Sequence, residues 1–368
     1  MLAGAITGYL LASGWHSNEM VRTRNAKLMV WAAVGFAQVK EETAKRAGDT
    51  EQSPLPPKAS ALTPIMAQQR TNAPPNRNGV GPSSVVLPEG PWALVIEFLV
   101  QRFPGVNEAT WLQRLKAGDV IDDQGQVLTP GAHYQAKQRL YYFRAVEVEP
   151  HIPFEEVVLW QDAHLLVVDK PHFLPVMPSG KYLQETVLIR LKNKLGLADL
   201  TPIHRIDRDT AGLVLFSKQS ATRNAYHALF RDRAVHKTYE CVAPWNAALP
   251  WPIHRESHIA ASAHFMQQTE VPGPVNAITD IEPIEVAGQW ARYRLHPVTG
   301  QRHQLRVHMA ALGLPLRGDG IYPVLTPEGS ADYRQPLQLL AKEIEFIDPL
   351  SGEARRFTSQ RALQNLPM

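Results

Sequence analysis

A loop crowded with charges runs directly into an apolar β-type segment at His204–Leu215. One carboxylate, Asp207, lies between the guanidinium groups of Arg205 and Arg208, and a neighbouring guanidinium favours the ionised form of a carboxylate. Gly212 allows the backbone to turn sharply or to approach another group closely. We expect the strand that follows to hold the loop rigidly, as a functional site requires. A salt-bridge cluster at the start of a strand is the alternative interpretation.

A second informative segment, Leu295–Asp319, combines basic and polar residues with a helical pattern. The pattern predicts a helix over Thr299–Leu312 with Leu305 and Met309 inward and a stop at Gly313.

Together the two segments resemble the RluA-type RNA pseudouridine synthases. Those enzymes carry an His-Arg-Leu-Asp-x-x-Thr-Ser-Gly-Leu loop and a Thr-Gly-Arg-x-His-Gln-Leu-Arg-Val-His helix. Two further segments match in order: Asp169–Gly180 looks like the family's Lys-Pro-x-Gly-x-x-Val segment, and Lys237–Val242 looks like its Lys-x-Tyr-x-Ala-x-Val strand. The resemblance covers roughly Val157–Phe357.

The expected fold class is α+β, because the predicted strands and helices do not alternate strictly. The resemblance implies the same class: a catalytic domain with a mixed, mostly antiparallel sheet and a central cleft, preceded by a small α/β RNA-binding-like domain.

The resemblance implies isomerisation of uridine to pseudouridine in a structured RNA, ribosomal or transfer, with the target base flipped out of its stack. Asp207 is then the nucleophile, at either C6 of the base or C1′ of the ribose. Tyr239 stacks on the base and is a candidate for proton removal at C5, and Arg306 pairs with the aspartate and orients it. Arg205 enters the stack that the base has left. The other substrate-binding candidates are His204, Thr210, Gly212, Arg302 and Gln304.

The predicted helix suggests two further interpretations. Arg302 lies four residues before Arg306, so a basic stripe aimed at phosphate is one interpretation and a solvated face is the other. His303 and His308 are five residues apart and point to different faces, so we interpret each as a satisfied or solvated histidine. The segment His172–Val176 departs from the family's Gly-containing turn, and we expect it to reshape the pocket.

Composition narrows the class of protein. A formal charge of +3 is compatible with RNA as the partner without being diagnostic. The single Cys241 excludes an intramolecular disulfide and a multi-cysteine zinc site, and it fits a cytoplasmic setting. The reaction requires neither metal nor cofactor, so none is expected. No apolar run is long enough to cross a bilayer, so no membrane partner is expected, and a monomer without an obligatory protein partner is the default.

We expect four parts along the chain. Residues 1–50 form an atypical N-terminal extension, with Met66 as a candidate true start, and residues 51–90 form a flexible Pro-rich linker. Residues 91–148 form the small domain, and residues 153–360 form the catalytic domain. Helices near 92–100 and 110–118 are expected in the small domain, where RNA contact and a purely structural role both remain open.

Two rival functions each fit part of the sequence. A catalytically silent RNA-binding protein on the same fold would not need Asp207, Tyr239 and Arg306 together, yet all three are present. A kinase is suggested by His-Arg-x-Asp, but the chain lacks a Gly-rich phosphate loop and an Asp-Phe-Gly motif.

Overall fold

The computed structural model describes residues 73–144, 149–327 and 332–367. The predicted extension at 1–50 and the linker as far as residue 72 lie outside the described residues. Among the described residues, no helix is long and apolar enough to span a membrane.

The first folded unit packs two helices on a small antiparallel sheet with the strand order β1-β3-β2. Trp111 and Leu99 are fully buried in its core. The predicted linker is wrong in its last part, because residues 83–86 pair with β3 and Leu87 is fully buried. Both expected helices are present, and the second ends at Gly118 in the left-handed conformation. The elements are β1 (Ser83–Val86), α2 (Val95–Arg102), α3 (Glu108–Ala117), β2 (Val120–Asp122) and β3 (Arg139–Tyr142).

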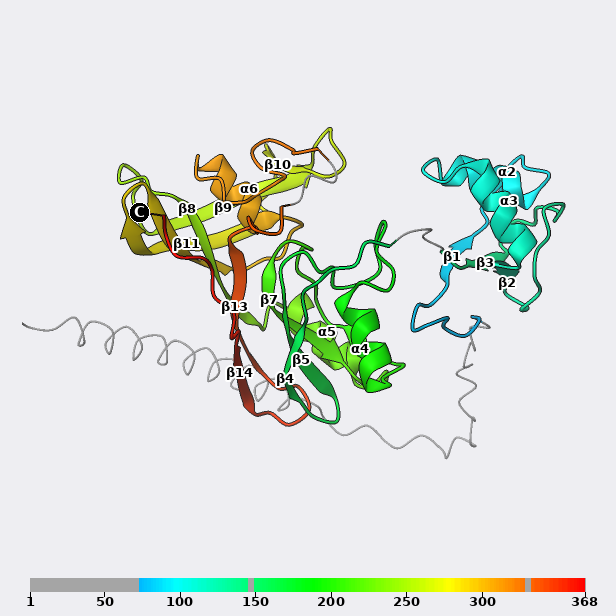
Figure 1. Ribbon diagram of the computed structural model, residues 1–368, viewed down its shortest axis with the longest axis horizontal. Coiled ribbons are helices and arrows are strands. Elements are labelled where there is room, and N and C mark those ends of the chain that lie inside the picture. Colours follow the sequence, from blue (N-terminus) through cyan, green and yellow to red (C-terminus); the bar gives the residue numbers. More distant parts are fainter. Residues whose placement is uncertain (1–72, 145–148, 328–331, 368) are drawn as a thin grey trace, which may run out of the picture. The chain divides into compact units, whose positions relative to one another are not determined.

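The second part is built on a large sheet with the order β10-β9-β11-β12-β8-β13-β7-β5-β4, to which β14 adds at β13 and β6 at β7 (Figure 1). Within the described residues its ladders are antiparallel except for the one between β7 and β13. The expected α+β class with a mixed, mostly antiparallel sheet is therefore confirmed. The strands are β4 (Val157–Gln161), β5 (Leu165–Lys170), β6 (Thr201–Pro202), β7 (Ala211–Ser217), β8 (His236–Pro244), β9 (Ile253–Ala261), β10 (Gln268–Val271), β11 (Ala277–Ala287), β12 (Trp290–Pro297), β13 (Leu339–Ile347) and β14 (Ala354–Thr358).

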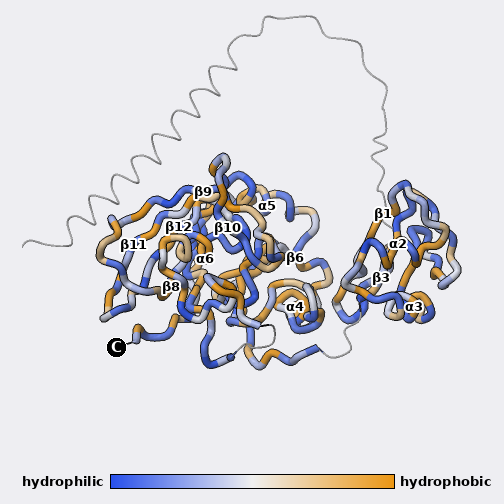
Figure 2. Tube along the Cα trace, turned by 90° about the horizontal axis from the view of Figure 1, so that it is seen from above, coloured by the Kyte–Doolittle hydropathy of each residue, from blue (hydrophilic) through white to orange (hydrophobic). Residues whose placement is uncertain are grey.

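Three helices cover this sheet: α4 (Val187–Leu195), α5 (Arg223–Arg231) and α6 (Gln304–Ala311). Strand β5 is buried on both faces, because Leu166 packs in one core with α4 while Leu165 packs in another with α5. Buried and partly exposed residues alternate along β12, and its buried residues share a core with α6. Such alternation buries one face of a strand. Figure 2 shows α6 against this part of the sheet.

Two predicted helix starts need correction. The helix expected from Thr299 begins only at Gln304, because His303 takes a left-handed φ of 57° that interrupts helical geometry. Likewise the sequence predicts a helix over Ala221–Arg231 with Ser220 as its N-cap, but α5 begins at Arg223 and its N-cap is Thr222. Segment 299–303 is consequently a loop.

Gly212 explains how the parallel pair of strands forms. Its φ is 108°, and a Cβ there would lie 2.2 Å from the carbonyl oxygen of Ala341 in β13. Only glycine allows this close approach. The backbone of β13 therefore fits between β7, which follows the Asp207 loop, and β8, which carries Tyr239.

Candidate active site

A cavity of about 430 Å³ opens beside the Asp207 loop. Its walls come from that loop, the turn between α5 and β8, the 297–301 segment and the start of α6. Two predicted site residues do not line it: Gly212 packs against β13, and exposed Arg302 donates to the carbonyl oxygens of Phe265 and Met266. Of the two interpretations of Arg302, the exposed side chain before α6 favours the solvated one over a basic stripe shared with Arg306. The predicted site residues that do line the cavity are His204, Arg205, Asp207, Thr210, Tyr239, Gln304 and Arg306.

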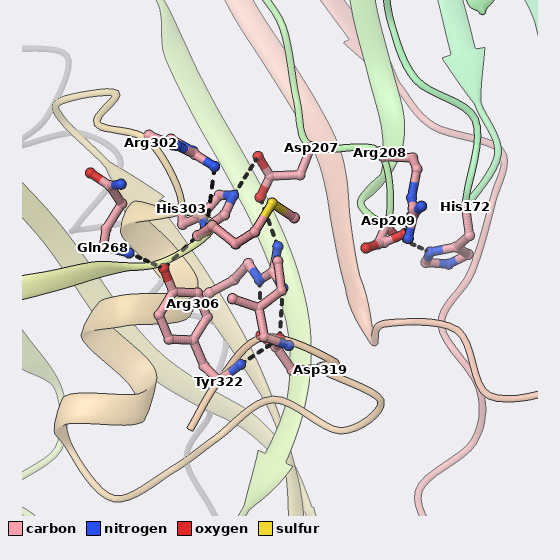
Figure 3. A network of polar contacts seen from close by, with 12 residues as sticks. His172, Asp207, Arg208, Asp209, Gln268, Arg302, His303, Arg306, Asp319 and Tyr322 are labelled. Carbon is pink, nitrogen blue, oxygen red and sulfur yellow. Dashed lines mark hydrogen bonds and ion pairs between the residues drawn. The ribbon is translucent and has the colours of Figure 1, made fainter. Parts of the chain in front are cut away.

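Arg306 joins two carboxylates. Its Nη1 donates to Oδ2 of Asp207 at 3.2 Å, while Nε and Nη2 bind Asp319 at 2.9 and 2.6 Å (Figure 3). Burial opposes the charge of Arg306, but the hydrogen bonds and charge of Asp319 raise its pKa above the ordinary value. The bidentate pair fixes the plane of the guanidinium, so the third donor points at Asp207.

His303 faces the other oxygen of the same carboxylate. Its Nε2 lies 3.7 Å from Oδ1 of Asp207, and its Nδ1 lies 3.0 Å from the hydroxyl of Tyr322. That hydroxyl accepts from the N–H of Gln268 at 2.7 Å, so its own proton is directed to Nδ1. Burial is the main cause that lowers the pKa of His303. We infer a neutral ring with its proton on Nε2, facing Asp207.

His303, Asp319 and Tyr322 together with Arg306 form what we call the buried network. The sequence interpretation missed its first three members. His303 was interpreted only as a satisfied or solvated histidine, and its place inside the matched helix motif was the signal that could have identified it. Asp319 and Tyr322 belong to a loop whose approach to Arg306 depends on tertiary folding. Both backbone N–H groups of Ile321 and Tyr322 donate to Asp319, which fixes that carboxylate in turn.

The Asp207 loop is supported from behind by two donors. Lys170 is fully buried and donates to the carbonyl oxygens of Pro171 and Arg208, both at 2.9 Å. Burial lowers the pKa of Lys170 to about 7. His172 binds the carbonyl oxygen of Asp209 through Nδ1 at 2.7 Å. His172 does not line the cavity and instead supports the loop that does, so the reshaping expected from His172–Val176 stays a prediction.

Tyr239 lies in the cavity wall, half-buried, on the strand face that also carries buried Cys241. Burial, and secondarily the charge of Asp207, raise the pKa of its hydroxyl above the ordinary value. The phenol is therefore protonated at neutral pH and presents an aromatic face and a donor.

The other lining candidates mainly shape the wall. His204 accepts the N–H of Leu215 at 3.1 Å and stacks on Phe230. Burial lowers its pKa to about 3, so its ring is neutral. Gln304 makes its side-chain hydrogen bonds to neighbouring protein groups, including Thr299. Thr210 is buried and closes a turn by donating its N–H to the carbonyl oxygen of Asp207.

Among the described residues, no group of three or more histidine, cysteine, aspartate or glutamate side chains is arranged to hold a metal ion. The chemistry available from the described cavity residues is thus a fixed carboxylate, an aromatic ring and several cations.

Comparison with known proteins identifies the family. The model of the RNA pseudouridylate synthase family matches residues 164–311, which include Asp207, Tyr239 and Arg306. An uncharacterized RNA pseudouridine synthase of Synechocystis is 31% identical over 239 residues, which are 62% of this chain and 79% of that protein.

Two further relatives have more specific names. The dual-specificity RNA pseudouridine synthase RluA of Yersinia pestis is 30% identical over 55% of this chain and 97% of its own length. The tRNA pseudouridine synthase C of Vibrio cholerae is 30% identical over 53% of this chain and 87% of its own length. With these likenesses and the four ordered motifs, the chain belongs to the RluA-type RNA pseudouridine synthases.

Proposed function

We propose that Asp207 is the nucleophile with which this RNA pseudouridine synthase isomerises a uridine that has been flipped out of a structured RNA. The reaction breaks the bond between N1 and C1′ and forms one between C5 and C1′. One proton leaves C5 and N1 gains one, so product and substrate are isomers.

One observation carries the proposal: Asp207 is the only carboxylate among the described residues that line the cavity. Its side chain is 28% exposed, while Arg306, which holds it, is 2% exposed. A carboxylate fixed by a buried cation, with one side open to the cavity, is positioned to meet a substrate atom without reorganising.

Tyr239 and Arg205 complete the proposed reaction site. Stacking on Tyr239 would hold any flipped pyrimidine, because every base has a π-face. Because the raised pKa of Tyr239 keeps its hydroxyl protonated, we assign this residue first to stacking on the base and to hydrogen-bond donation. Its part in proton removal at C5 is a question for the Tyr239→Phe variant. Exposed Arg205 has a planar guanidinium that would fill the space left in the RNA stack.

RNA is the proposed partner, without an obligatory protein partner and with the chain acting as a cytoplasmic monomer. Ribosomal and transfer RNA both remain candidate substrates; the dual-specificity name of one relative and the tRNA name of another support testing both.

The deciding experiment maps pseudouridine across the transcriptome of cells that lack this protein, complemented by wild type or by Asp207→Asn. The variant keeps the side-chain shape and removes the charge and nucleophile, so turnover is expected to fall at least about 10⁴-fold. A site restored by wild type alone would establish the activity and name the RNA. Equal restoration by the variant would overturn the role of Asp207.

Tyr239→Phe separates stacking from hydroxyl chemistry. The ring is kept, so RNA affinity should be unchanged, and single-turnover kinetics should be slower if the hydroxyl takes part. An unchanged rate would restrict Tyr239 to stacking.

A further inference from the structure

Three cations of the cavity have no ion-pair partner among the residues that the structure describes. Arg306 is paired with Asp319 and Asp207, and Arg231 is paired with Asp232. Among the described residues, no carboxylate pairs with the remaining three, which we call the cationic rim: Arg205, Arg233 and Lys237.

Lys237 is the most informative member because it is partly removed from water. Its side chain is half-buried, and its Nζ donates to the carbonyl oxygen of Thr299 at 3.1 Å. Burial, and then the charge of Arg233, lower its pKa to about 8. An ammonium has three donors, and within the described part of the chain one of them is occupied, by the carbonyl oxygen of Thr299. A partly buried cation without a counter-charge is costly to keep, so folding alone does not explain this lysine.

Arg233 has an unusual backbone conformation. It follows the end of α5 with a φ of 57°, and its N–H and that of Ala234 donate to the carbonyl oxygens of Phe230 and Leu229. This is the capping geometry in which glycine is normally found, because a Cβ is unfavourable there. An arginine at a position suited to glycine indicates that its exposed guanidinium is needed at this end of the cavity.

We propose that Arg233 and Lys237 form a subsite that binds the backbone phosphate adjoining the flipped nucleotide. The inference rests on the proposed function, because only an RNA substrate brings a phosphodiester next to the uridine at Asp207. A guanidinium and an ammonium are the two groups that proteins use most for phosphate, one through paired donors and the other as a point charge. The subsite would supply affinity and register and would carry no sequence information.

The test uses the uridine trinucleotide UpUpU and an analogue whose two linkages are neutral methylphosphonates. Affinities for both are measured by calorimetry with wild type, Arg233→Gly, Lys237→Met and the control Lys194→Met. Lys194 is an exposed lysine on α4 that does not line the cavity. Wild type should prefer the charged trinucleotide, and each rim variant should lose about tenfold of that preference while the control keeps it.

Arg233→Gly is chosen because it removes the side chain without straining the fold. Glycine suits a φ of 57°, so the melting temperature should be unchanged or higher. If the role of Arg233 were purely structural, Arg233→Gly would bind the charged trinucleotide at the wild-type level. Equal binding of the two trinucleotides by wild type, or full discrimination by Arg233→Gly, would overturn the proposal.

Pseudouridine formation is measured separately by mass spectrometry on transfer and ribosomal RNA transcripts. If wild type discriminates between the trinucleotides but forms no pseudouridine, the subsite stands and the proposed function fails. If Arg233→Gly and Lys237→Met both modify RNA with wild-type kcat/KM, the subsite fails and the proposed function stands.

Discussion

The cations in two regions of one cavity differ in pairing and in exposure. In the buried network, Arg306 is 2% exposed and is held by two carboxylates. In the cationic rim, Arg205 and Arg233 are exposed, and no carboxylate pairs with either among the described residues. The guanidinium group is therefore used in two ways in the same cavity: paired and buried in the network, and exposed in the rim.

The difference teaches how geometry and affinity are separated. A guanidinium that is already paired keeps one orientation and can position Asp207, but it has little charge left to offer RNA. An unpaired guanidinium is mobile and solvated, so it can attract phosphate over a distance that falls with salt. Changes in the buried network should therefore alter kcat, and changes in the rim should alter affinity.

Among the residues that support Asp207 or attract RNA to it, the largest effect is expected at Asp319. Asp319→Asn leaves Arg306 buried with one carboxylate, so the free energy of unfolding should fall by about 3 kcal/mol. Loss of orientation should lower the single-turnover rate about 100-fold. Urea denaturation and single-turnover kinetics measure the two effects.

The matched control is Asp232→Asn, which breaks the exposed pair with Arg231 and should shift the urea midpoint much less than Asp319→Asn does. A loss of stability in Asp232→Asn as large as that in Asp319→Asn would remove the distinction between exposed and buried ion pairs.

His303→Gln tests the second contact to Asp207. We expect kcat to fall about threefold to tenfold with KM unchanged, because the 3.7 Å approach is weaker than the bond from Arg306. Tyr322→Phe should produce a smaller change of the same kind, since it only frees the His303 tautomer. A rise in KM without loss of kcat would place His303 in RNA binding.

Lys170 gives a prediction for the pH dependence of stability. Its pKa is about 7 when folded and 10.5 ordinarily, so the unfolded chain holds the extra proton between these values. Stability contributed by this site should therefore rise as the pH increases from about 7 towards 10.5. Lys170→Met should flatten the rise in urea midpoints over this window, whereas Lys194→Met should leave it as in wild type.

Arg231 should give the smallest effect. It lines the cavity but is already paired with Asp232, so Arg231→Met should weaken RNA binding less than about twofold at 0.15 M salt. The same substitution at Arg233 should weaken it more. Filter binding across a salt series compares the two variants, and equal losses would show that pairing does not decide which arginine of the cavity binds RNA.

Much of the fold was predictable because its signals are local. The apolar run Leu165–Val168 lies within β5, and the alternating pattern at residues 237–243, around Tyr239, lies within β8. The large sheet and its mostly antiparallel pairing were expected and are confirmed. The strand Ser83–Val86 was missed because its short sequence is surrounded by Pro and Gly, and its pairing with β3 is long-range.

The site was predicted less completely, for a physical reason. The nine residues proposed from sequence came from motifs, and their roles remain proposals, but a motif does not give the direction of a side chain. Arg302 was placed on a helix that begins only after the left-handed His303. Gly212 proved to contact a strand whose sequence lies more than a hundred residues away. The role of Asp319 becomes visible only in the folded chain, where it pairs with buried Arg306.

The support beneath the Asp207 loop has a consequence for how such an enzyme diversifies. Lys170 and His172 hold the loop through the carbonyl oxygens of Arg208 and Asp209, and Thr210 closes it through its own backbone. A loop held by its main chain can exchange side chains without moving its nucleophile. The loop side chains that contact RNA can therefore change during evolution while the position of Asp207 and the reaction are retained. New RNA targets would then arise through substitutions at the loop surface, without change to the hydrogen bonds that hold its main chain.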